Sequence, residues 1–274
     1  MRILEARNIA KYHKTFNGKH SPTLEKISFD VKKKEFLCIV GPSGCGKSTL
    51  LKILAGLERP SEGEVRLYGE PVLSPHPKIS MVFQNFALFP WRTVIQNIEF
   101  GLETQGVPKT VRRKIAEELV NLMGLKGYEN AYPKDLSGGM RQRVAIARAL
   151  AVDPDIVLMD EAFSAIDEYT AQILRSEVLE LWEDYDKSFI LVTHNLAEAL
   201  EMGDRIIILT RKPAKVKHVY HVNLKRPRRR SQPQFLKCLK ELFTMLENEL
   251  EHTIVRHKLK SIYEHHKLDD MESY

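Results

Sequence analysis

The segment Gly41–Thr49 combines residue types that bind phosphate. It matches the pattern G-x-x-x-x-G-K-[ST] at every position, with Gly41, Pro42, Ser43, Gly44, Cys45, Gly46, Lys47, Ser48 and Thr49. Glycines let backbone N–H groups turn inward around an anion, and a following helix directs its N-terminus at the same anion. Lys47 can reach the β- and γ-phosphates, and the Ser48 hydroxyl can hold Mg²⁺. The segment therefore predicts a site for a nucleoside triphosphate with Mg²⁺.

Two carboxylates end the apolar run Ile156-Val-Leu-Met-Asp160-Glu161. Burying a carboxylate in a sheet is costly unless a cation or hydrogen bonds compensate for it, and a magnesium nucleotide would do so. We expect Asp160 to reach the Mg²⁺ directly or through water. Glu161 would face the γ-phosphate and polarise the attacking water. Taken alone, this pair is a weak signal that a simple turn would also explain, and the phosphate loop favours the catalytic interpretation.

A second anion-binding helix start lies just before this strand. Ser137, Gly138 and Gly139 form a helix-capping serine followed by two glycines, ahead of a helical pattern. One nucleotide needs only one phosphate loop, so the second start predicts a shared site. Two copies packed head to tail would place these residues of one subunit on the γ-phosphate that the other subunit holds.

The elements that must position these residues alternate between strand and helix. Five short apolar runs predict buried strands at Glu35–Val40, Ile79–Phe83, Ile156–Met159, Phe189–Val192 and Arg205–Leu209. Helical stretches are predicted at Lys47–Leu57, Lys109–Met123, Gly139–Leu150 and Thr170–Trp182. This alternation is typical of an α/β protein with a largely parallel sheet.

Composition excludes several other classes of protein. The 274 residues are 43% apolar and 28% charged, which argues against a disordered, collagen-like or small disulfide-stapled chain and fits one or two domains. The apolar runs fall short of the about 20 residues that a membrane span needs. Cys38, Cys45 and Cys238 form no C-x-x-C pair, which favours a reducing compartment. The first residues lack an apolar signal-peptide core, so we expect a cytosolic protein.

The composition shifts near Val222. Lys225–Arg230 has the sequence Lys-Arg-Pro-Arg-Arg-Arg, which we interpret as a linker or domain boundary. Apolar residues then recur every three or four positions and predict an amphipathic helix or helical hairpin, at Phe235, Leu239, Leu242, Phe243, Leu246, Leu250 and Ile254. The polar end, about residues 264–274, is expected to be frayed.

The motifs, taken in this order, resemble those of the ATP-binding subunits of ABC transporters over about residues 1–222. The resemblance implies that Gln84, in Met81-Val-Phe-Gln84, contacts Mg²⁺ and the attacking water as the Q-loop glutamine. Ser164-Ala-Ile-Asp167 resembles the D-loop, which crosses the dimer interface. His194, in Leu191-Val-Thr-His194, is similar to the switch histidine that contacts the γ-phosphate.

The same resemblance implies a fold and its divisions. It is a P-loop NTPase core of ABC ATPase type, with an antiparallel β subdomain, an inserted α-helical subdomain and a C-terminal helical extension. The core would use residues 1–84 and 151–222, the helical subdomain about 85–150, and the linker and extension 223–274. An aromatic side chain should stack on adenine. Phe16 and Tyr12 are the candidates, Phe16 being favoured by its distance from Gly41, and core packing is the alternative for either.

The sequence departs from the usual family pattern at four positions. Lys34 stands where many relatives carry glycine, and Ala162 where proline often follows the catalytic glutamate. Asn195 replaces the common aspartate after the switch histidine, and Met140 a common glutamine. These changes remove no group that the chemistry requires.

Further residues resemble one importer subfamily, which handles nitrate, sulfonate, taurine and related small solutes. They are Leu88-Phe-Pro-Trp-Arg-Thr-Val94 with Asn97 and Phe100, Ala162-Phe-Ser-Ala-Ile-Asp167, and Arg226-Pro-Arg228. The resemblance implies a homodimer, or a pair with a similar ATPase subunit, held peripherally on the cytoplasmic face of the membrane. A permease would dock in a groove lined by Phe86, Leu88, Phe89 and Trp91, some of which could instead be subdomain core. A solute-binding protein would be an indirect partner.

Two alternatives stay open. A soluble ABC-type ATPase acting on nucleic acid or ribosomes is slightly favoured by the net charge of +6 and by Lys225–Arg230. The single copy of each motif and the 90 residues between Lys47 and Ser137 argue against it, so nucleic acid is not the expected partner. A regulatory protein is the other alternative, with Phe235–His266 sensing a ligand or partner rather than packing on its own domain or on a twin.

Overall fold

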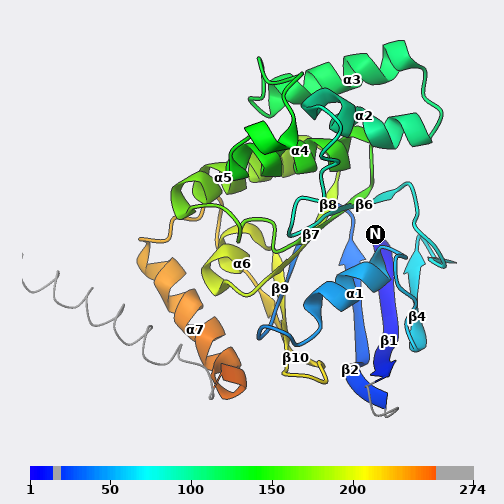
Figure 1. Cartoon of the computed structure of the whole chain (residues 1–274). Coiled ribbons are helices and arrows are strands. Elements are labelled where there is room, and N and C mark those ends of the chain that lie inside the picture. Colours follow the sequence, from blue (N-terminus) through cyan, green and yellow to red (C-terminus); the bar gives the residue numbers. More distant parts are fainter. Residues whose placement is uncertain (15–19, 251–274) are drawn as a thin grey trace, which may run out of the picture.

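The computed structural model describes residues 1–14 and 20–250, arranged as two sheets with helices around them (Figure 1). The larger sheet has the order β10-β9-β3-β8-β7-β6. Its strands are β3 (Phe36–Val40), β6 (Ile79–Val82), β7 (Ile156–Asp160), β8 (Ser188–Thr193), β9 (Arg205–Leu209) and β10 (Val216–His221). All pairs are parallel except β9 with β10. The five predicted strands are therefore confirmed, and β10 adds a half-exposed antiparallel edge.

The smaller sheet is antiparallel and confirms the expected β subdomain. Its order is β2-β1-β4-β5, with β1 (Arg2–Lys14), β2 (His20–Lys32), β4 (Glu62–Leu67) and β5 (Glu70–Pro71). Helix α1 (Lys47–Leu54) lies between the two sheets. Leu50 of α1 shares one apolar core with Ile9 of the small sheet and Ile39 of the large sheet. This core fixes the start of α1 against the end of β3.

Alternation along the buried strands separates two cores. Leu37 and Ile39 face the small sheet, whereas Phe36, Cys38 and Val40 face the opposite core. There Phe36 stacks on Phe189 with ring centroids 5.4 Å apart. Strands that are buried on both faces need apolar residues at successive positions, which explains the uninterrupted apolar runs in the sequence.

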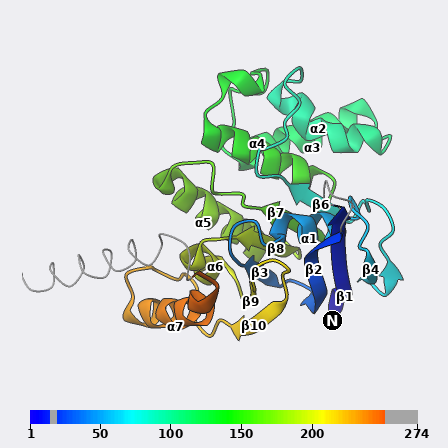
Figure 2. The same ribbon diagram turned by 60° about the horizontal axis from the view of Figure 1, so that its bottom comes forward.

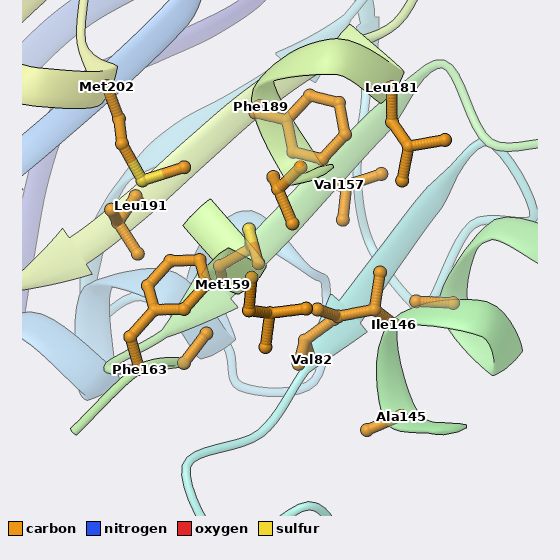
Figure 3. Packing of buried hydrophobic residues seen from close by; sticks show 14 of the residues in the cluster. Val82, Ala145, Ile146, Val157, Met159, Phe163, Leu181, Phe189, Leu191 and Met202 are labelled. Atoms are coloured by element: carbon orange, nitrogen blue, oxygen red, sulfur yellow. The ribbon is translucent and has the colours of Figure 1, made fainter. Parts of the chain in front are cut away.

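The remaining helices form the second layer and the far end of the molecule. They are α2 (Val94–Thr104), α3 (Lys109–Leu122), α4 (Gly138–Ala151), α5 (Glu168–Asp184), α6 (Leu196–Met202) and α7 (Pro233–Leu250), with a short 3₁₀ turn at Pro133–Asp135. Helices α2, α3 and α4 gather at one end (Figure 1). Figure 3 shows Ala145 and Ile146 of α4 packed near Val82 of β6 and Met159 of β7. This packing ties the helical end to β7, which carries Asp160 and leads into Glu161.

The basic segment Lys225–Arg230 is bound to the rest of the chain. Arg226 donates to Asp204, and the buried Arg228 donates to the carbonyls of Leu200 and Gly203 at 2.8 and 2.6 Å. The amphipathic helix predicted beyond it is confirmed as α7, with Phe235, Leu242 and Leu246 buried. Figure 2 shows α7 beside α6 and β10. The predicted features beyond residue 250, including Ile254 and the polar end, lie outside the described residues.

Candidate nucleotide site

The phosphate loop connects β3 directly to α1. Gly44 and Gly46 have φ values of 76° and 116°, a region that side chains disfavour. A Cβ on Gly46 would also lie 2.8 Å from Leu24 and 2.9 Å from Thr23. No side chain of the described residues caps the start of α1, so its first N–H groups are available to an anion.

Lys47 and Ser48 join the loop to the carboxylates at the end of β7. Lys47 is 4% exposed, and its ammonium donates to the carbonyls of Gly41 and Pro42 at 2.8 and 3.1 Å. The Ser48 hydroxyl donates to Asp160 at 2.9 Å. Burial raises the pKa of Asp160 above its ordinary value, although the Ser48 hydrogen bond acts in the opposite direction. The cost of burying the ionised carboxylate is thus only partly offset by the Ser48 hydroxyl and by the charges of Lys52 and Lys47.

This donor set fits Mg²⁺ bound together with nucleotide phosphates. Magnesium is usually held by one or two carboxylates plus substrate phosphates and water rather than by an all-protein cage. Ser48, Asp160 and Gln84 supply oxygen ligands of that kind. Within residues 1–14 and 20–250 no cluster of three His, Cys, Asp or Glu side chains could bind a metal. The residues present thus suit an ion that arrives with its nucleotide.

Glu161 is the meeting point of three segments. Its φ of 46° lies in the left-handed region, and its N–H donates to the Val192 carbonyl at 2.9 Å. Gln84 donates to one Glu161 oxygen at 3.3 Å, and Nδ1 of His194 lies 3.3 Å from the same oxygen. Strained backbone of this kind persists where the surroundings hold it, and it aims the carboxylate at the other two side chains. The structure therefore brings together Glu161, Gln84 and His194.

A cavity of about 320 Å³ lies beside these residues. Its lining comprises Gly44, Gly46, Lys47, Ser48, Thr49 and Glu161 together with His13, Thr23 and Lys212. Sequence reasoning missed His13, Thr23 and Lys212. Lys212 follows β9, and in parallel sheets ligands bind at the carboxyl ends of the strands, so its position could have signalled it.

The adenine-stacking candidates are placed differently. The Tyr12 hydroxyl donates to Glu62 at 3.2 Å, and the cavity is lined by the neighbouring His13 rather than by Tyr12. Successive strand residues point to opposite faces, so the two side chains cannot share one environment. Phe16 lies outside the described residues. The stacking role of Phe16 or Tyr12 stays a prediction.

The second predicted anion site begins α4. Ser137 accepts a hydrogen bond from the Met140 N–H at 3.2 Å, as a helix-capping residue does. A Cβ on Gly139 would lie 2.6 Å from Thr170, so glycine allows α4 to approach α5. Asp167 caps α5 by accepting from the Thr170 N–H at 2.9 Å. Ser137–Gly139 and Asp167 thus lie at neighbouring helix starts, and neither lines the cavity of its own chain.

This phosphate loop, carboxylate pair and sheet order define a nucleotide-hydrolysing cassette. A family model described as ABC transporter matches residues 24–164. The chain belongs to the family of ABC transporter ATP-binding proteins. As a member of this family it binds and hydrolyses ATP with Mg²⁺.

Individual relatives agree with this assignment. An uncharacterized ABC transporter ATP-binding protein of Methanocaldococcus jannaschii is 46% identical over 247 residues, which cover 90% of this chain and 92% of the relative. The aliphatic sulfonates import ATP-binding protein SsuB of Bacillus cereus is 43% identical, over 82% of this chain and 88% of its own. A dimeric post-hydrolysis structure of an ATP-binding cassette, bound to ADP and phosphate, is 33% identical with a TM-score of 0.73. It matches over 81% of this chain and all of its own.

Across residues 1–14 and 20–250, no helix is long and apolar enough to cross a membrane.

Replacing Asp160 by asparagine should abolish Mg²⁺ binding without lowering the stability of the nucleotide-free protein. Because the folded-state pKa of Asp160 is raised, the wild-type protein loses stability as pH rises through the interval between the ordinary and the raised value. Asparagine keeps an oxygen for the Ser48 hydroxyl but removes this charge. We expect the nucleotide-free variant to melt at the same temperature as wild type, or higher, at neutral pH. Its thermal stabilisation by ATP should no longer respond to Mg²⁺.

Differential scanning calorimetry with and without Mg²⁺ and ATP measures both effects. Asp184→Asn, at the end of α5, is the control. An Asp160→Asn protein that keeps the full Mg²⁺-dependent stabilisation would contradict the assignment of Asp160.

Proposed function

We propose that this chain energises a membrane importer for small solutes of the nitrate, sulfonate and taurine class. It works as a head-to-tail dimer with two ATP molecules between the copies. The observation that carries the proposal is a cluster of aromatic side chains, with Trp91 exposed, that follows Gln84 in the chain. The relative named as an aliphatic sulfonates importer supports the class of solute.

The chain's own residues divide the chemistry between them. Lys47 and the loop amides bind the phosphates, and Ser48, Asp160 and Gln84 would hold Mg²⁺, which neutralises phosphate charge when bound. Ser137–Gly139 of the second copy would complete the γ-phosphate site and exclude water. Glu161 orients the attacking water and accepts its proton, and His194 contacts the γ-phosphate. Phosphoryl transfer needs mainly positioning and charge neutralisation, which these groups provide.

The aromatic cluster has the properties of a partner surface. Phe89 packs on Phe100 and Trp91 with ring centroids 4.4 and 5.7 Å apart, and Trp91 is 71% exposed. The Arg92 guanidinium lies over the Phe100 ring at 4.9 Å. Large aromatic side chains beside arginine are typical of the residues that dominate binding at interfaces. Phe86 and Leu88 are partly buried against the core, so they support the surface from beneath.

The aromatic cluster is connected to the nucleotide site through Gln84 and to helix α4 through Arg148. Gln84, which contacts Glu161, precedes Phe86 and Ala87 by two and three positions. The carbonyls of Phe86 and Ala87 accept hydrogen bonds from Arg148 of α4 at 2.8 and 2.6 Å. The helix that starts at Ser137–Gly139 therefore contacts the loop on which the aromatic cluster lies. A change at the nucleotide site can reach a docked permease along this path.

The nucleic-acid alternative loses part of its support. Arg226, Arg228 and Arg230, which made the segment Lys225–Arg230 strongly basic, bind acidic side chains and carbonyls within the chain. These charges are therefore compensated internally rather than displayed to a phosphate backbone.

Glu161→Gln tests the hydrolytic role. General base catalysis typically contributes about 10²–10⁴-fold, so steady-state phosphate release should fall by about that factor. Equilibrium binding of a fluorescent ATP analogue should be preserved, because the phosphate loop is unchanged. Glu70→Gln, on exposed β5, is the matched control. Unimpaired turnover of the Glu161→Gln protein would refute this role.

Trp91→Asp tests the partner surface. A tagged chain carrying it should lose a polytopic membrane protein that the wild-type chain retains at near one-to-one from detergent-solubilised native membranes. Leu73→Asp, at a position 70% exposed and outside the cluster, should retain the partner. If the Trp91→Asp chain still retains the membrane protein, the aromatic cluster is not the surface that binds it. Recovery of only soluble proteins or nucleic acid with wild type would favour the soluble ATPase.

A further inference from the structure

Two catalytic segments end at neighbouring helices. The segment from Glu161 to Asp167 leads into α5, whose first residue is Glu168. His194 precedes Asn195, which caps α6 by accepting from the N–H groups of Ala197 and Glu198. The position of α5 relative to α6 therefore sets where the far ends of both segments lie.

A buried arginine joins the two helices. Arg175 of α5 is 1% exposed and donates to Glu201 of α6 at 3.0 Å and to Glu168 at 2.8 Å. It also lies 3.9 Å from the buried Glu198. A buried guanidinium needs such compensation, but three carboxylates around one arginine leave an excess of negative charge. Glu168 and Glu201 would then repel each other across the two helices.

Arg230 supplies the missing positive charge from the C-terminal part of the chain. It donates to Glu168 at 2.8 Å and to Glu201 at 3.0 and 3.2 Å, using the same two carboxylate oxygens that Arg175 uses. Its neighbour Arg228 is buried and bonded to the carbonyls at the end of α6, which limits where Arg230 can lie. The basic segment Lys225–Arg230 is thereby fixed on α6, and its Arg230 reaches Glu168, the first residue of α5.

We propose that Arg230 is a positioning residue for ATP hydrolysis. It joins the start of α5 to α6 and so keeps the Glu161–Asp167 segment and His194 in a fixed position relative to each other. This inference rests on the proposed roles of Glu161 and His194. Arg230 does not line the nucleotide cavity; it acts through Glu168 and Glu201. The C-terminal extension is in this way part of the catalytic framework.

The test uses the full-length chain with Arg230→Gln, Arg230→Lys and Arg229→Gln. Arg229 is the adjacent exposed arginine and serves as the matched control. For Arg230→Gln we expect kcat to fall roughly 3- to 30-fold with KM for ATP unchanged, the range typical of residues that couple sites. Amide hydrogen exchange should accelerate in residues 164–170 and 194–201. Arg230→Lys should recover part of kcat, and Arg229→Gln should match wild type.

A double variant separates positioning from general destabilisation. Because Arg230 acts through Glu168, Glu168→Gln with Arg230→Gln should lower kcat no further than Arg230→Gln alone. Glu161→Gln, measured in parallel, reports on the proposed function separately. If Glu161→Gln is inactive while Arg230→Gln matches Arg229→Gln in kcat and exchange, the positioning role of Arg230 is wrong and the function stands. A raised KM at unchanged kcat, or uniform acceleration of exchange over the whole chain, would also overturn it.

Discussion

The structure depends on placing two carboxylates where cations can compensate them. Asp160 is 5% exposed at the end of β7, and Glu161 follows it at a strained backbone position. In a low-dielectric interior such groups are tolerated only beside positive charge or strong hydrogen bonds. Lys47 and the Ser48 hydroxyl approach them from the loop after β3. The sheet order, which separates β3 from β7 by β8 alone, makes that approach possible.

Packing around this pair connects the nucleotide site to two other parts of the molecule. The core between α4 and the strands β6 and β7 fixes the helical end of the molecule to the strand that carries Asp160. Gly139 allows α4 to meet α5 closely, and Arg148 bonds the same helix to the loop after Gln84. One helix therefore contacts both the segment that would meet a second copy and the loop that would meet a permease. Interdigitated packing of this kind transmits displacements rather than absorbing them.

Much of the core and of the candidate nucleotide site was predictable from the sequence because its signals are local. The doubly buried strands appear as short apolar runs, and the phosphate loop requires glycine at fixed positions. The structure explains two departures from the family pattern. Lys34 adopts a φ of 57°, which glycine accommodates more easily, and Asn195 caps α6 with the oxygen that aspartate would provide.

Other features depend on partners that are distant in the chain. The run Lys225–Arg230 has the composition of a linker, but Arg230 binds Glu168 and Glu201, which lie 62 and 29 positions earlier. No local pattern indicates such pairings. In the same way, His13 lines the cavity, whereas the sequence favoured the aromatic residues Phe16 and Tyr12 in this region.

The central claim is that each ATP site is shared between two copies of the chain, and mixing two inactive variants tests it most directly. Lys47→Ala removes the phosphate-binding half of the site. Gly138→Asp places a negative charge in the other half, at a position where a Cβ would make only ordinary contacts, 3.4 Å from Ile166. A mixed dimer contains one intact composite site, so an equimolar mixture should recover up to roughly a quarter of wild-type turnover while each variant alone stays inactive. Continued inactivity of the mixture, with both variants folded and Gly138→Asp still binding ATP, would contradict the account.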